Sequence, residues 1–139
     1  KGEGAKVACG GEAPGDLKKG YFVKPTVFTG CNNDMRIAQE EVFGPVLAVI
    51  PFTKMEDVAE QANKTTFGLS GAVWTKDVKK AHKFASHIKA GTIWVNCYNV
   101  FDPAVPFGGY KMSGYGRELG KHSMELYTNI KSVWVNLMD

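Results

Sequence analysis

Residues 46–96, VLAVIPFTKMEDVAEQANKTTFGLSGAVWTKDVKKAHKFASHIKAGTIWVN, decide the fold. Three segments rich in apolar and β-branched residues are predicted strands: Val46–Phe52, Ser70–Thr75 and Thr92–Asn96. A segment with helical periodicity separates each strand from the next. Strands that alternate with helices through short connections are typical of parallel sheets built from right-handed crossovers. The sequence therefore predicts an α/β fold centred on a βαβαβ parallel sheet.

Both helical segments carry signals for their first turn. Thr53 and Glu56 have the spacing of a capping box, in which a hydroxyl and a carboxylate bond to backbone N–H groups. Thr75 is predicted to cap the second helix, with Asp77 in its first turn and Gly91 after its end. The apolar positions that give each helix its buried face are Val58, Ala59 and Ala62 in the first and Val78, Ala81, Ala85 and Ile88 in the second.

The residues before this unit are predicted to form shorter elements. Lys6–Cys9 is a predicted strand, and Asp34–Glu40 is a predicted short helix. Tyr21–Phe28 is rich in aromatic and β-branched residues and is also a predicted strand. Pro25 interrupts it, and because proline donates no backbone hydrogen bond, this position indicates an edge strand or a bulge.

The end of the chain is predicted to add a helical stretch at Lys121–Tyr127 and a strand at Ile130–Leu137. This strand lies outside the βαβαβ series and has no obvious partner within the chain. An unpaired terminal strand is a candidate for pairing with another subunit. The alternative is that it joins the edge of the local sheet, and the residues alone leave both possibilities open.

Residues 40–45, EEVFGP, form a first candidate binding segment. A carboxylate at this position can accept hydrogen bonds from two vicinal hydroxyls of a sugar. The aromatic Phe43, two residues after Glu41, can pack against a ring or a ribose face. The alternative is a solvated acidic pair beside a phenylalanine of the core.

The loop that begins at Asn96 is a second candidate. It leaves the carboxyl end of a predicted parallel strand, where ligands bind in such sheets, and it continues to about Gly116. Its aromatic residues Phe101, Phe107 and Tyr110 and its prolines suit a rigid wall of a pocket for a small apolar substrate. Alternatively, the loop folds its aromatic side chains back into the core.

Composition and the remaining motifs exclude several classes of function. The net charge of +3, from 17 basic and 14 acidic residues, is too mild, and the lysines too scattered, to indicate nucleic acid. No apolar run is long enough to span a membrane. The three widely spaced cysteines predict no disulfide framework and no metal site, and they favour a reducing, cytoplasmic compartment. Cys97 is predicted to be a buried inert thiol. The three histidines are predicted to lie at the surface or to have their ring nitrogens satisfied by hydrogen bonds.

Two segments together resemble the aldehyde dehydrogenase superfamily: EEVFGPV at 40–46 and NCYNVFDPAVPFGGYKMSGYGRELG at 96–120. They are most similar to its broad-specificity tetrameric branch, which includes retinal, acetaldehyde and betaine aldehyde enzymes. The resemblance covers essentially the whole chain, including GYFVKPTVF at 20–28. It implies that residues 1–128 are the C-terminal part of a catalytic domain and that residues 129–139 are an oligomerisation strand, in a dimer or a tetramer.

The resemblance also implies roles for individual residues. Glu41 matches a glutamate that holds the hydroxyls of the nicotinamide ribose of NAD or NADP, and Phe43 matches an aromatic that packs beside that ribose. Leu69 matches a leucine near the nicotinamide. Phe101 and Phe107 match aromatics that line the tunnel for a small aldehyde substrate.

In the family mechanism, a cysteine thiolate attacks the aldehyde, a hydride passes to the nicotinamide, and a glutamate-activated water releases the carboxylic acid. The nucleophile, the general base and the Rossmann domain lie upstream of EEVFGPV in the family, whereas only 40 residues precede Glu41 here. The isolated chain is therefore expected to be inactive. Glu118, which matches a glutamate proposed to relay protons, is the single catalytic candidate. The alternative function is a non-catalytic remnant that serves as a structural or oligomerisation module.

Overall fold

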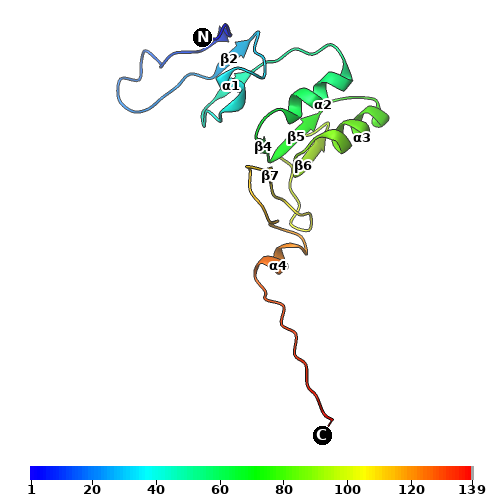
Figure 1. Ribbon diagram of the computed structural model, residues 1–139. Helices are drawn as coiled ribbons and strands as arrows, with labels where there is room; N and C mark the ends of the chain where they lie inside the picture. The colour runs from blue at the N-terminus through cyan, green and yellow to red at the C-terminus, as the bar shows by residue number, and fades with distance from the viewer. Residues whose placement is uncertain (139) are drawn as a thin grey trace. The chain divides into compact units, whose positions relative to one another are not determined.

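The computed structural model of the chain describes residues 1–138 and contains two compact units. Unit 1 is Lys1–Thr66, and unit 2 begins at Phe67. Figure 1 labels most of the helices and strands along the chain. None of the helices within residues 1–138 is long and apolar enough to cross a membrane.

Unit 1 is built on a three-stranded sheet in the order β1-β2-β3. β1 (Lys6–Cys9) pairs with β2 (Thr26–Thr29) in antiparallel orientation, and β3 (Val46–Ala48) pairs with β2 in parallel. α1 (Arg36–Gln39) lies in the connection from β2 to β3, and α2 (Met55–Asn63) follows β3. The strand predicted over Tyr21–Phe28 is therefore limited to the residues that follow Pro25, because the ladder begins only there.

The core of unit 1 is small and lies between this sheet and α1. Its buried members are Ala5, Cys31 and Met35, and the partly buried side chains that pack against them are Phe28, Ile37, Ala48 and Ile50. Thr26 is also buried, and its hydroxyl accepts from the Gly11 N–H and donates to the Lys24 carbonyl, both at 2.8 Å. These bonds satisfy a buried hydroxyl and fix the long connection between β1 and β2.

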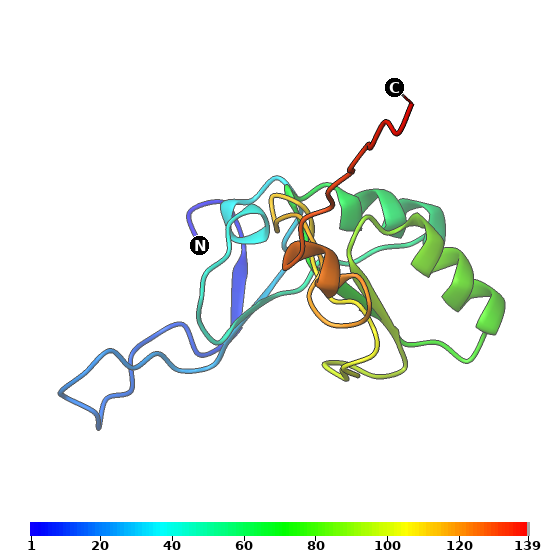
Figure 2. The ribbon, with the colours of Figure 1, turned by 90° about the horizontal axis from the view of Figure 1, so that it is seen from below.

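Unit 2 contains two small sheets. β5 (Ser70–Val73) and β6 (Thr92–Val95) form a parallel pair, and β4 (Phe67–Gly68) and β7 (Tyr110–Lys111) form an antiparallel pair. The helix α3 (Val78–His87) connects β5 to β6 and lies alongside their sheet in both ribbon views (Figures 1 and 2). A short helix, α4 (Ser123–Leu126), lies near the end of the chain.

The two predicted helix caps are wrong in detail. α2 begins after Lys54, and its first turn has no side-chain cap, so Thr53 and Glu56 form no capping box. α3 is capped by Asp77 instead of Thr75, because the backbone of Asp77 is still extended. The Asp77 carboxylate accepts from the N–H groups of Lys79 and Lys80 at 2.9 and 3.1 Å. The predicted buried face of α3 is confirmed at Ala81, whereas Ala85 and Ile88 are half-buried and Val78 is exposed.

The α/β class and its parallel strand pairing are confirmed. The unit β5–α3–β6 is a parallel strand–helix–strand, with Ser70 opposite Thr92 and Val73 opposite Val95. β3, however, lies in a different sheet from β5 and β6, because its parallel neighbour is β2 of unit 1. Local alternation of elements predicted the class correctly but not how the strands divide between sheets.

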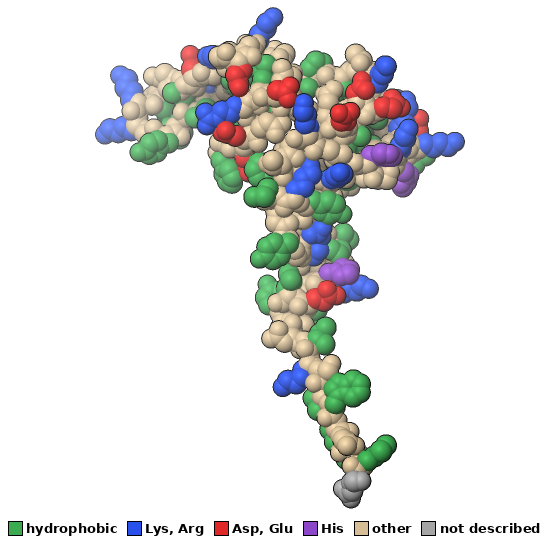
Figure 3. Space-filling model, viewed as in Figure 1, with side chains coloured by type: hydrophobic (Ala, Val, Ile, Leu, Met, Phe, Trp, Pro, Cys, Tyr) green, Lys and Arg blue, Asp and Glu red, His purple; other side chains and the backbone are tan. Residues whose placement is uncertain are grey.

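The terminal segment, residues 129–138, contains no strand among the residues that the structure describes. Its large apolar side chains are almost fully exposed, with Ile130 at 99%, Trp134 at 95% and Leu137 at 88%. Figure 3 shows hydrophobic side chains along its length. The possibility that this segment joins the local sheet edge is therefore wrong. Pairing with another subunit stays a prediction.

Candidate functional site

Glu40 and Glu41 follow α1 directly, and the structure gives these neighbouring carboxylates different surroundings. The Glu40 carboxylate accepts from Arg36 Nε at 2.7 Å, four residues earlier, and this hydrogen bond raises the pKa of the Arg36 guanidinium. The Glu41 carboxylate has no hydrogen bond or ion pair with any side chain within residues 1–138. Glu41 is therefore the carboxylate that is available to a ligand.

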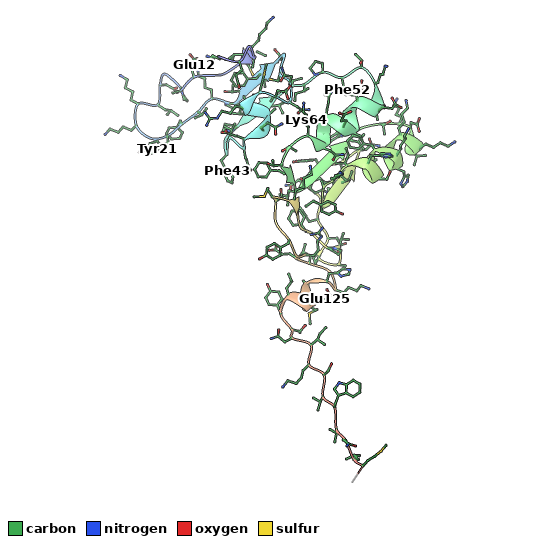
Figure 4. The ribbon with its side chains drawn as sticks, in the orientation of Figure 1. Glu12, Tyr21, Phe43, Phe52, Lys64 and Glu125 are labelled. Atoms are coloured by element: carbon green, nitrogen blue, oxygen red, sulfur yellow. The ribbon has the colours of Figure 1, made fainter. Side chains whose placement is uncertain are left out.

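Phe43 has an unusual backbone conformation for a bulky residue. Its φ of 53° lies in the left-handed region, which is strained for any residue with a large side chain. Its ring is 91% exposed, so packing within the described chain does not compensate for this strain (Figure 4). The predicted alternative, in which this phenylalanine belongs to the core, is wrong. Strain of this kind is concentrated at binding sites, where it fixes the direction of a side chain.

Glu41 and Phe43 line the same cavity, which has a volume of about 360 Å³. The cavity lies between α1, the turn after it and β3. The complete set of lining residues is Ile37, Glu40, Glu41, Val42, Phe43, Gly44, Val46 and Ala48. The lining thus offers both carboxylates and apolar side chains, a combination that suits a ligand with both hydroxyls and a ring.

Replacing Phe43 with glycine is expected to stabilise unit 1, because glycine adopts a positive φ without strain. The expected gain is about 1 kcal/mol, the lower end of the cost of a strained residue. Urea unfolding of the variant measures it, with Val42→Gly as a control that removes an exposed neighbouring side chain without a positive φ. A Phe43→Gly variant no more stable than the parent chain would contradict the argument that this backbone is strained.

The second candidate site is built around Trp94, a buried residue of β6 that is 8% exposed. The Trp94 ring contacts the rings of Tyr98 and Phe101 edge to face, at centroid distances of 5.0 and 5.5 Å. Phe101 in turn contacts Phe107 edge to face at 5.1 Å. The loop thus brings together the two predicted substrate-lining residues. Phe101 contacts both Trp94 of β6 and Phe107, and it stays half exposed.

Phe101 and Phe107 line a second cavity of about 260 Å³, which is mostly apolar. The residues around it are Thr92, Ile93, Trp94, Val100, Phe101, Asp102, Val105, Pro106 and Phe107. Both sequence-based possibilities for this loop are thus partly realised. Its aromatic side chains Tyr98 and Phe101 pack against Trp94 of β6, and the loop also leaves a cavity beside them.

The far end of the loop returns to Phe107 through Glu118. The backbone groups of these two residues exchange two hydrogen bonds of 2.7 Å, while the Glu118 side chain is exposed. The neighbouring Arg117 guanidinium donates to the carbonyls of Gly109 and Gly116 at 3.0 and 2.6 Å and lies over the Tyr110 ring. These contacts close the loop and pair the backbone of Glu118 with that of Phe107, which lines the second cavity.

The other predicted residues lie in plainer surroundings. Leu69 is exposed between β4 and β5, and its carbonyl accepts from the Thr92 N–H. Cys97 is exposed, so the prediction of a buried thiol is wrong: the chain leaves the sheet at this residue. The three histidines are exposed as predicted, and no group of three or more metal-ligating side chains occurs within residues 1–138.

Sequence reasoning missed the roles of Trp94 and Arg117. Trp94 was assigned only to a strand, although a tryptophan in the middle of a short strand is a typical centre for aromatic packing. For Arg117 the local pattern gives no signal, because nothing in it predicts that its donors turn back onto loop carbonyls.

Residues 1–133 match the model of the aldehyde dehydrogenase family. A putative aldehyde dehydrogenase of Bacillus subtilis (strain 168) is 55% identical over 139 residues, which is all of this chain and 28% of that protein. Aldehyde dehydrogenase 1A1 of Gallus gallus is 53% identical over 137 residues, which is 99% of this chain and 26% of that protein. The chain therefore spans about a quarter of the length of these relatives.

Solved structures agree with these matches. The NAD+ complex of an aldehyde dehydrogenase from Bacillus cereus has a TM-score of 0.91 and 55% identity, and the match covers 99% of this chain and 28% of that one. An aldehyde dehydrogenase of Mycobacterium tuberculosis in complex with NAD+ has a TM-score of 0.91 and 50% identity, over 98% of this chain and 28% of that one.

Proposed function

This chain belongs to the aldehyde dehydrogenase family, and we propose that it forms part of an enzyme that oxidises an aldehyde to a carboxylic acid with NAD as the cofactor. Its contribution is proposed to be two binding surfaces. The cavity of unit 1 receives the nicotinamide ribose, and the cavity of unit 2 receives the organic part of the aldehyde. The observation that carries the proposal is the free carboxylate of Glu41 beside the exposed ring of Phe43.

The residues of unit 1 fit a ribose. Two vicinal hydroxyls can each donate a hydrogen bond to the Glu41 carboxylate, which has no competing partner within residues 1–138. The exposed Phe43 ring offers an apolar face for the sugar. Leu69, an exposed apolar side chain, is proposed to lie near the nicotinamide. When bound, NAD supplies the ring that accepts a hydride, and these residues orient it.

The residues of unit 2 fit an apolar aldehyde. Phe101 and Phe107 line a mostly apolar cavity, and their rings contact each other edge to face. Preordered apolar walls favour the substrate chain over water and reduce the entropy lost on binding. Glu118 is proposed to relay protons, and the backbone bridge to Phe107 holds it beside this cavity.

The nucleophile and the general base are proposed to come from outside residues 1–139. The exposed cysteines Cys9 and Cys97 lie outside both cavities, and the buried Cys31 lies in the core of unit 1. The terminal segment 129–138 is proposed to bury its exposed apolar side chains against a second copy, in a dimer or a tetramer. The cytoplasmic compartment stays a prediction.

A chimera tests the proposal: residues 1–139 replace the matching segment of the putative aldehyde dehydrogenase of Bacillus subtilis. The chimera is expected to reduce NAD in the presence of an aldehyde, whereas the chain 1–139 alone is expected to be inactive. The measurement is the increase in absorbance of the NADH that is formed. A folded, NAD-binding chimera that oxidises no aldehyde of a varied panel would contradict the proposed function.

A further inference from the structure

Asn96, the first residue of the aromatic loop, continues the pairing of β5 and β6 with its side chain. Its backbone N–H donates to the Val73 carbonyl at 2.9 Å. Its Oδ1 accepts from the Thr75 N–H at 2.8 Å, and its Nδ2 donates to the Thr75 carbonyl at 2.9 Å. The carboxamide therefore pairs with the backbone of Thr75 as the backbone of a further strand residue would, because an amide offers both a donor and an acceptor.

The backbone of Asn96 also sets where the chain turns. Its φ of 55° lies in the left-handed region, which asparagine tolerates better than most residues. The chain therefore leaves the direction of β6 at this residue while its side chain still holds the end of β5. Aspartate has the same shape but lacks the donor, and glycine allows the same φ but lacks the carboxamide.

We call the two hydrogen bonds between the Asn96 side chain and the Thr75 backbone the Asn96 clamp. This clamp is anchored on α3, the helix that connects β5 to β6. The Thr75 hydroxyl oxygen accepts from the Asp77 N–H at 3.1 Å, and Asp77 caps α3. At the other end of the segment that begins at Asn96, the Val100 carbonyl accepts a hydrogen bond from the Trp94 indole N–H at 2.8 Å. The loop from Asn96 to Val100 is thus held at both ends, and Phe101 follows immediately.

We propose that Asn96 is a positioning residue whose side-chain clamp on Thr75 holds the Trp94–Phe101 contact and hence the wall of the second cavity. The importance of that wall for an aldehyde rests on the function proposed above. The clamp itself is a property of the chain, so it can be tested without cofactor or substrate.

The test is hydrogen exchange of the Trp94 indole N–H in the chain 1–139, followed by NMR. Asn96→Asp and Asn96→Gly are each expected to accelerate this exchange about tenfold, the effect of losing one or two hydrogen bonds. The β6 backbone amides that face β5, those of Thr92 and Trp94, are expected to keep their rates. Asn99→Asp is the matched control, because Asn99 has a φ of 59°, lies in the same loop and undergoes the same change of charge.

Faster exchange of the indole alone in the Asn96 variants supports a positioning role. Unchanged indole exchange in Asn96→Gly overturns it, and so does equal acceleration of the β6 amides, which indicates a general contribution to stability. Should Asn96→Asp fail to fold, Asn96→Gly still gives either result. A positive outcome stands even if the chimera oxidises no aldehyde, so failure of the clamp and failure of the proposed function are distinguishable.

Discussion

Replacing Gly91 with alanine is expected to destabilise unit 2 by about 3 kcal/mol, the upper part of the range for overpacking. A Cβ atom at this position would lie 1.6 Å from the Gly108 carbonyl oxygen and 2.7 Å from its carbonyl carbon. Both atoms belong to the backbone, so no side-chain rotation relieves the clash. The aromatic loop and the start of β6 would have to separate.

Urea unfolding followed by tryptophan fluorescence measures this effect. Gly15→Ala is the matched control, because a Cβ there meets nothing within 4 Å and its φ is not positive. That change is expected to leave the unfolding midpoint near that of the parent chain. Equal midpoints for the two variants would show that Gly91 does not hold the loop against β6.

Replacing Glu41 with alanine in the chimera is expected to weaken NAD binding about 10- to 100-fold. The free-energy basis is the loss of charge-assisted hydrogen bonds to the ribose hydroxyls, worth about 1.5–3 kcal/mol. The dissociation constant can be measured by titration calorimetry or by quenching of protein fluorescence. Stability is expected to change little, because the Glu41 carboxylate has no partner within residues 1–138.

Glu40→Ala is the matched control for this experiment. Glu40 is adjacent and carries the same charge, but its carboxylate is engaged by Arg36. Glu40 lines the same cavity, but its carboxylate is held by Arg36, so its removal is expected to leave the dissociation constant for NAD within about twofold. If both variants weaken binding equally, the effect is one of general charge, and the specific role of Glu41 is wrong.

Local sequence patterns predicted the elements whose stability depends on nearby residues. The apolar spacing of Ala81, Ala85 and Ile88 identified α3, and the β-branched runs on either side of it identified β5 and β6. The resulting parallel unit is correct because a strand, a short connection and a helix leave few alternatives for the next strand. The segment at Glu41 and Phe43 was likewise identified from residues adjacent in the chain.

Other features depend on contacts between distant residues and were missed or assigned incorrectly. Thr75 and Asp77 are both suitable caps, and only the backbone conformation decides between them. Cys97 has an apolar side chain in a strand-like context, yet the turn at Asn96 exposes it. Neither choice follows from spacing, because each depends on the direction that the chain takes after a strand.

The sequence by itself determined the α/β class, the order of the elements and the segments that carry the candidate site residues, because periodicity and turn chemistry act over a few neighbouring residues. Only the tertiary structure decided which strands share a sheet, that Glu40 is paired while Glu41 is free, and that Trp94 gathers Phe101 into one cluster. Those outcomes depend on hydrogen bonds and packing between residues that the chain brings together only when it folds.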